Sequence, residues 1–158
     1  MELLKGFKSA LSAKNTRAIP GAVFNFLALG HETGGRHALI KILVERGAEP
    51  ARHTHSREDE SYYILRGGIQ FSIGDDQFTV TEGEYIHLPK DVPHSFKLIS
   101  DEAEVLMWLN PAGLEQWFWD NSAPAPDGKP LGIPQGPPPK ELIEHFVSSL
   151  KSYGVEMI

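Results

Sequence analysis

The most informative run of residues is His53-Thr-His55-Ser-Arg-Glu-Asp-Glu60, and a further histidine, His94, follows a short turn bounded by prolines. In an extended segment side chains alternate between two faces, so His53 and His55 point the same way. Glu60 begins the strand-like run Glu-Ser-Tyr-Tyr-Ile-Leu, and His94 opens another short strand. Three imidazoles and one carboxylate can bind a divalent transition metal and leave positions open for other ligands. The sequence therefore predicts a metal site on a β scaffold.

Strand signals dominate on both sides of this stretch. Runs rich in β-branched and aromatic residues recur at short intervals, and Gly-Gly, Gly-Asp-Asp and Glu-Gly turns separate them. Many short strands with regular turns indicate an all-β sandwich or barrel. The predicted strands cover residues 22–29, 36–45, 61–65, 69–73, 77–80, 85–88, 95–99 and 103–109.

The spacing of the four candidate ligands resembles the two motifs of the cupin superfamily. The first motif is matched without a gap by Gly47-x5-His53-x-His55-x4-Glu60-x6-Gly67, and the second by Gly83-x5-Pro89-x4-His94-x-Phe96. Fifteen residues separate the two motifs, a compact spacing similar to that of single-domain bacterial cupins. Two departures, Asp91 where glycine is usual and Leu98 where asparagine is frequent, fall at positions that are not ligands.

This resemblance implies a double-stranded β-helix, the cupin or jelly-roll barrel, with the metal site in its mouth. We place the barrel at residues 21–110, between an N-terminal extension (1–20) and a C-terminal region (111–158) that forms a lid, a proline-rich arm and a helix. In the extension, four apolar residues at helical spacing predict a short amphipathic helix. They are Leu3, Leu4, Phe7 and Leu11.

The composition changes after the last predicted strand. Apolar residues at i, i+3 and i+4 indicate a short helix within residues 111–120. Residues 123–139 hold seven of the twelve prolines, which predicts an extended arm. Apolar positions at helical spacing then predict a C-terminal helix over residues 139–153. The apolar helix, the arm and the surplus aromatic residues together predict self-association as a homodimer.

Five side chains are candidates for a substrate pocket. Tyr62 shares the face of Glu60, and Phe96 shares that of His94, because side chains two apart on a strand point the same way. Both belong to the barrel interior, and for both a core role is as well supported as a pocket role. The remaining three candidates lie in Pro111-Ala-Gly-Leu-Glu-Gln-Trp-Phe, which resembles the segment after the last barrel strand in quercetin-dioxygenase-like cupins. That resemblance implies a pocket mouth near Leu114, Trp117 and Phe118.

Length and charge narrow the functional classes. A chain of 158 residues fits one domain that can bury about 70% of its unfolded surface. The net charge of −6, without a cluster of Lys and Arg, makes nucleic acid a poor partner. No apolar run approaches the roughly 20 residues of a membrane helix, and the start lacks the pattern of a signal peptide. With no cysteines, which fits a reducing compartment, we expect a cytoplasmic protein that takes a small-molecule substrate.

The resemblance to quercetin-dioxygenase-like cupins implies a dioxygenase that acts on a small aromatic or enol-type molecule. Its cofactor would be one divalent ion, and three imidazoles and a carboxylate suit Fe, Mn, Ni, Co and Zn alike. Glu60 would serve as a ligand and as the catalytic proton acceptor. Two alternatives stay open, because the cupin fold serves several functions. One is a non-catalytic or sensory binding module, and the other is a sugar isomerase or epimerase, which would need cationic residues in the pocket.

Overall fold

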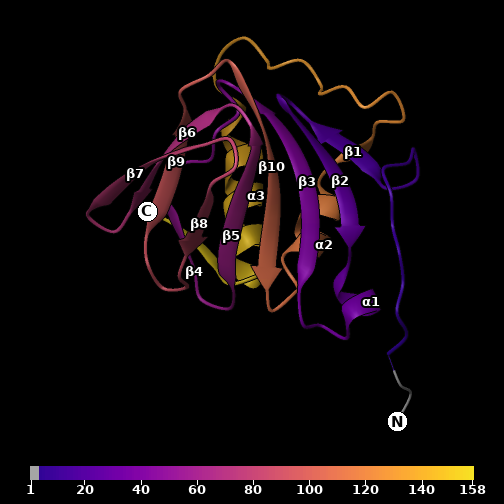
Figure 1. The fold of residues 1–158 in the computed structure, drawn as a ribbon. Helices are drawn as coiled ribbons and strands as arrows, with labels where there is room; N and C mark the ends of the chain where they lie inside the picture. The colour runs from indigo at the N-terminus through magenta and orange to yellow at the C-terminus, as the bar shows by residue number, and fades with distance from the viewer. Residues whose placement is uncertain (1–3) are drawn as a thin grey trace.

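The computed structural model describes residues 4–158 and consists mostly of antiparallel strands arranged in two facing sheets (Figure 1). The larger sheet has the order β11-β1-β2-β3-β10-β5-β8, and the smaller has the order β12-β4-β9-β6-β7. Strands far apart in the sequence are therefore neighbours, as β10 is between β3 and β5. This topology confirms the predicted double-stranded β-helix.

All eight predicted strands are present, with ends within two residues of those expected, and four more short strands complete the sheets. The larger sheet contains β11 (Ala123–Pro124), β1 (Thr16–Ile19), β2 (Ala22–Ala28), β3 (Ala38–Glu45), β10 (Glu102–Asn110), β5 (Asp59–Arg66) and β8 (Tyr85–Leu88). The smaller sheet contains β12 (Val155–Met157), β4 (His53–His55), β9 (His94–Leu98), β6 (Gly68–Ile73) and β7 (Asp76–Thr81). Three of these strands, β1, β11 and β12, lie outside residues 21–110 and still pair with barrel strands.

The core lies between the two sheets and follows from the period-two pattern of the strands. Every second side chain of β3 and β10 is buried, and the large side chains of Phe71 and Ile69 from β6 meet them from the facing sheet. Burying one such side chain contributes about 1.5–3 kcal/mol. The barrel thus has a continuous apolar core that does not depend on a metal.

The predicted N-terminal helix is wrong for the residues that the structure describes. Residues 4–15 contain no helix and form an arm beside β2, where the Ser9 hydroxyl donates a 2.5 Å hydrogen bond to the Leu27 carbonyl (Figure 1). The apolar side chains Leu4, Phe7 and Leu11 remain about half exposed, and Leu3 lies outside the described residues. So short a helix is stable only when an apolar face is buried, and these side chains stay about half exposed.

Three helices accompany the sheets: α1 (Gly30–Thr33), α2 (Glu115–Asp120) and α3 (Lys140–Ser152). The last two confirm the predicted helices within residues 111–120 and 139–153, although α2 begins later than expected. The buried carboxylate of Glu115 accepts a 2.9 Å hydrogen bond from the Gly30 N–H and thereby fixes the start of α2 against the end of β2. None of the helices among residues 4–158 has the length and apolar character needed to cross a membrane.

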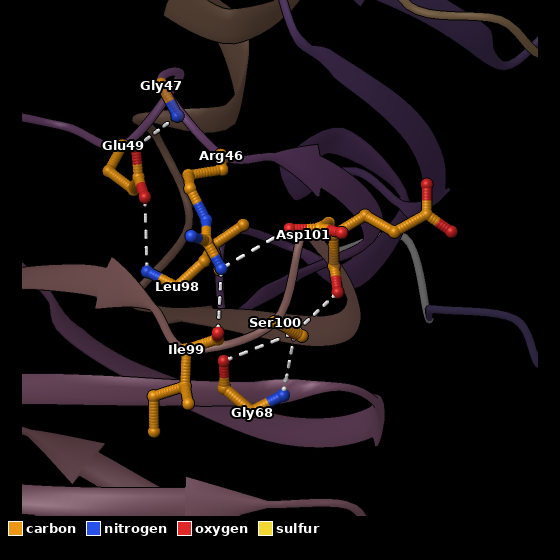
Figure 2. Close-up of polar contacts among 9 residues, drawn as sticks. Arg46, Gly47, Glu49, Gly68, Leu98, Ile99, Ser100 and Asp101 are labelled. Carbon is orange, nitrogen blue, oxygen red and sulfur yellow. Dashed lines mark hydrogen bonds and ion pairs between the residues drawn. The ribbon is translucent and has the colours of Figure 1, made fainter.

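A polar network holds the loop that leads into β4 (Figure 2). The Glu49 carboxylate accepts hydrogen bonds from the Gly47 N–H at 2.6 Å and from the Leu98 N–H at 3.1 Å, and Arg46 donates to the Ile99 carbonyl at 2.8 Å. Burial opposes ionisation of Glu49, but these backbone donors and the neighbouring guanidinium outweigh it and keep the carboxyl pKa below its ordinary value. The loop before the ligand strand is therefore tied to the end of β9.

Gly67, at the turn between β5 and β6, cannot be replaced without strain. Its φ of +89° lies in the left-handed region, and a Cβ there would stand 2.7 Å from both the Glu102 carbonyl oxygen and the Ser100 hydroxyl. That hydroxyl accepts a hydrogen bond from the Gly68 N–H (Figure 2). The motif thus requires glycine here because the turn between β5 and β6 lies close against the turn that leads into β10.

Candidate metal centre

The structure brings together the four predicted metal ligands from three separate strands. His53 and His55 project inward from β4, and the register of β4 with β9 sets His94 opposite His53. Glu60 is the second residue of β5 in the other sheet. The candidate ligand atoms of the four residues lie within 4.8 Å of one another, and all four side chains are buried.

Backbone carbonyls fix the orientation of two of the imidazoles. The Nδ1 of His53 lies 2.7 Å from the Ala51 carbonyl oxygen, and the Nδ1 of His94 lies 3.1 Å from that of Val92. A carbonyl oxygen can only accept a hydrogen bond, so Nδ1 carries the proton and Nε2 keeps a free lone pair. Both rings therefore offer Nε2 as the ligand atom.

Glu58 orients the third imidazole, and the sequence analysis missed this residue. Its Oε1 lies 2.5 Å from the Nδ1 of His55, and both side chains are buried. The sequence does contain a hint of this role, since Glu58 and Glu60 are two apart and share a face. A run of three acidic residues, however, does not reveal which of them are buried. A carboxylate that binds the far nitrogen of a metal-ligating histidine fixes the ring and makes it a better donor.

Two of the ligand atoms have no hydrogen-bond partner among the described residues. They are the buried Nε2 atoms of His55 and His94. His94 Nε2 comes within 3.3 Å of Glu60 Oε2, but without the geometry of a hydrogen bond. Leaving a buried polar atom unsatisfied costs about 1–3 kcal/mol, so such atoms mark a missing partner. Three nitrogen donors and one carboxylate oxygen, all within 4.8 Å of one another, fit a divalent transition metal.

In the metal-free chain, burial and the neighbouring charges of the cluster shift the pKa values of its side chains. Burial lowers the pKa of His53 below its ordinary value. Burial also disfavours the charged form of His55, but its hydrogen bond to Glu58 and the Glu60 carboxylate outweigh this and raise its pKa. For Glu60, burial is outweighed by the surrounding imidazoles, which lower the carboxyl pKa. Burial and then the Glu60 charge raise the pKa of the Tyr62 phenol well above its ordinary range.

A cavity of about 340 Å³ opens beside the cluster. Its polar side chains gather at one end, where His53, His55, Glu60 and Tyr62 line it. Apolar side chains make up the rest of the wall. The five candidates for a substrate pocket lie in the wall of this cavity: Tyr62, Phe96, Leu114, Trp117 and Phe118.

The sequence analysis placed residues of α2 at the pocket mouth but did not foresee that α3 and β12 also form a wall of this cavity. Phe146 and Leu150 of α3 and Val155 and Met157 of β12 line it as well. Trp117 of α2 joins this wall to the rest, because its Nε1 donates a 2.9 Å hydrogen bond to a serine hydroxyl of α3 and its ring packs against Phe146. The cavity is therefore closed by two helices that the barrel itself does not contain.

The fold and the cluster define a β-barrel protein with a buried three-histidine, one-carboxylate centre beside an apolar cavity. Residues 41–110 match the family model of the cupin domain, Cupin_2. This match identifies residues 41–110 as a cupin domain.

Similar sequences cover parts of the chain. An uncharacterised protein of Methanocaldococcus jannaschii is 29% identical over 68 residues, 43% of this chain and 54% of that protein. Quercetin 2,3-dioxygenase of Bacillus subtilis is 21% identical over 86 residues, 54% of this chain and 26% of the enzyme. The chain thus spans about half the length of the first relative and about a quarter of the second.

Similar structures agree on the fold. An RmlC-like cupin from Shewanella frigidimarina superposes with a TM-score of 0.59 at 16% identity, over 72% of this chain and 99% of that one. Ectoine synthase from P. lautus superposes with a TM-score of 0.57 at 17% identity, over 78% of this chain and 85% of that one. At these identities the likeness shows the fold alone.

Proposed function

We propose that this cupin is a metal-dependent dioxygenase that acts on a small aromatic or enol-type molecule. The observation that carries the proposal is the division of the cavity: its polar side chains gather at the ligand end, and the rest of the wall is apolar. A flat apolar molecule with one oxygen-bearing edge fits such a site, with that edge toward the cluster. The similarity to quercetin 2,3-dioxygenase supports the same class of substrate.

Each residue at the polar end has a distinct role in this proposal. His53, His55 and His94 hold the ion through Nε2, and Glu60 completes the set of ligands. A divalent transition metal bound there would supply Lewis acidity and a template for substrate and dioxygen. The lowered pKa of Glu60 keeps its carboxylate ionised at neutral pH, so an oxygen of Glu60 can accept the proton of the substrate hydroxyl. The apolar wall excludes water from that proton transfer.

The cavity argues against the isomerase or epimerase alternative. Recognition of a sugar phosphate needs cationic side chains, and among residues 4–158 no lysine or arginine lines this cavity. The non-catalytic binding module would use the same pocket and the same ligands. Measurement of turnover distinguishes it from the dioxygenase.

The test is oxygen uptake by protein loaded with Fe(II), Mn(II) or Ni(II), measured across flavonols, catechols and diketones. We expect oxygen consumption with at least one of these compounds. Glu60→Gln should reduce turnover far more than metal occupancy, because the amide oxygen can still bind the ion but cannot accept the proton. Tight binding of a compound without oxygen uptake would establish the binding module instead. Normal turnover by Glu60→Gln would overturn the role of Glu60 as proton acceptor.

A further inference from the structure

The wall of the cavity beyond the metal ligands offers a bound molecule almost no hydrogen-bond partner. Apart from those ligands, only Tyr62 and Trp117 among the lining residues at positions 4–158 carry a side-chain nitrogen or oxygen. Tyr62 belongs to the ligand end, and Trp117 Nε1 already donates its hydrogen bond to the Ser149 hydroxyl at 2.9 Å. The thioether sulfurs of Met107 and Met157 are at most weak acceptors. The other lining side chains are hydrocarbon.

The backbone behind this wall is occupied as well. Phe24 of β2, Ile42 of β3 and Val105 of β10 lie opposite one another in the strand register and line the cavity, and we call this row of three the deep wall. Each of the three strands has a neighbour on both sides in the larger sheet. The N–H and C=O groups of such strands bond to those neighbours within the sheet. A ligand that lies against the deep wall therefore finds no free backbone partner either.

Water does not supply the missing partners along the deep wall. A buried water needs two to four polar neighbours, and an apolar cavity that lacks them stays dry. The exposed residues of the lining are Pro50 and Ala51, so the cavity opens to solvent at the loop that precedes β4. A polar group of a ligand is thus satisfied at the metal ligands or at this mouth, and not against the deep wall.

We infer that the substrate of this site carries its oxygen atoms on a single edge and is otherwise an unhydroxylated apolar body. The edge faces His53, His55 and Glu60, an orientation for which the inference rests on the proposed function. The body lies against the deep wall, because a cavity of about 340 Å³ is near the lower end of the range for ligand sites and leaves little room to avoid it.

This inference narrows the aromatic or enol-type class. It favours compounds such as 3-hydroxyflavone or an aryl 1,3-diketone, whose oxygens all lie on one edge. It disfavours flavonols with hydroxyls on both outer rings. With the oxygen edge at the metal ligands, at least one of those rings is directed away from the mouth and toward the deep wall, where its hydroxyl loses water and gains no partner.

The experiment measures binding and not turnover. Protein loaded with Zn(II), which has no redox chemistry, is titrated by calorimetry with two flavonols. One is 3-hydroxyflavone, and the other is 3,7,4′-trihydroxyflavone, which adds a hydroxyl to each outer ring and no second chelating pair. We expect 3-hydroxyflavone to bind and the trihydroxy compound to bind about 10- to 100-fold more weakly. Equal or tighter binding of the trihydroxy compound would overturn the inference, and so would a failure of both compounds to bind.

Val105→Thr and Val23→Thr are a matched pair that locates the penalty. Val105 belongs to the deep wall, whereas Val23 is equally buried but packs with Ala18 and Ala125 outside the cavity. Threonine at position 105 puts a hydroxyl donor and acceptor into the deep wall, so the ratio of the two affinities should narrow several-fold. Val23→Thr should leave the ratio unchanged. An unchanged ratio in folded Val105→Thr, or equal narrowing in both variants, would overturn the role of the deep wall.

Circular dichroism checks that both variants are folded, and if Val105→Thr unfolds, the wild-type ratio decides alone. Oxygen uptake separates this inference from the proposed function. Selective binding of 3-hydroxyflavone without oxygen uptake by Fe(II)-, Mn(II)- or Ni(II)-loaded protein supports the inference and removes the dioxygenase. Oxygen uptake together with equal affinity for the two flavonols removes the inference and leaves the dioxygenase.

Discussion

Glu58 holds His55 through a 2.5 Å contact between Oε1 and Nδ1 that is buried on both sides. The carboxylate therefore determines which nitrogen of His55 carries the proton and which faces the cluster. In the other two histidines a backbone carbonyl does the same. His55 is the one ligand among the three imidazoles whose orientation a single side-chain substitution can release.

Glu58→Gln should weaken metal binding without unfolding the barrel. The amide is a poorer acceptor than the carboxylate and carries no charge, so His55 loses both its fixed tautomer and part of its basicity. Loss of such a partner costs about 10–100-fold in metal affinity. Competition with a chelator measures the affinity, and Glu82→Gln, at an exposed turn position, is the control that should bind as the wild type does. Equal affinity of the two variants would contradict this role.

His53→Ala combined with His55→Ala should remove the metal and leave a folded protein. The apolar core between the sheets supplies the stability, and the double substitution removes two buried polar groups rather than core side chains. Metal analysis of the purified variant and its far-ultraviolet circular dichroism give the two readouts. Stoichiometric metal in this variant would eliminate the assignment of the site.

Mild acid should release the metal. Each imidazole must be neutral to bind through Nε2, and the ordinary histidine pKa is about 6.5. In the metal-free chain the His55 pKa is raised, so as the pH falls His55 takes up its proton first, and the lowered pKa of His53 makes it follow later. Affinity should thus begin to fall above the ordinary histidine pKa of about 6.5 and fall more steeply below it. Metal content after dialysis at a series of pH values tests this, and a constant content down to about pH 3 would argue against imidazole ligands.

Gly67→Ala should destabilise the barrel more than Gly35→Ala does. Both glycines have positive φ, at +89° and +76°, so an alanine at either position carries a left-handed backbone cost of about 1–2 kcal/mol. Only at Gly67 would the new methyl meet a carbonyl oxygen, since nothing lies within 4 Å of a Cβ at Gly35. The clash should bring the loss in free energy of unfolding at Gly67 to about 3 kcal/mol or more. Urea denaturation of both variants measures the difference, and equal losses would show that the close approach relaxes freely.

Local patterns sufficed to predict most of the barrel. Alternation of apolar residues defined the strands, and the motif spacing singled out His53, His55, Glu60 and His94 before any geometry was known. These signals work because a strand with one buried face must alternate, and because two ligands on one strand, such as His53 and His55, must point to the same side to reach one ion.

Long-range pairing and burial explain what the sequence did not predict. β12 is only three residues long and follows α3 almost directly, so nothing local indicates its pairing with β4. Leu4, Phe7 and Leu11 have the spacing of a helix, but each stays about half exposed in the protomer. Glu58 stands beside Asp59 and Glu60, and only the folded chain shows which carboxylates are buried.

The pairing of β12 with β4 has a consequence for how the protein is made. Val155 lies opposite His55, roughly 100 residues later in the chain. At a synthesis rate of about 5–20 residues per second, the strand that carries two of the ligands waits about 5–20 seconds for its partner. During that interval one edge of β4 is unpaired and the cavity lacks the wall formed by α3. All four candidate ligands are therefore synthesised before the residues of α3 and β12 that close the cavity beside them.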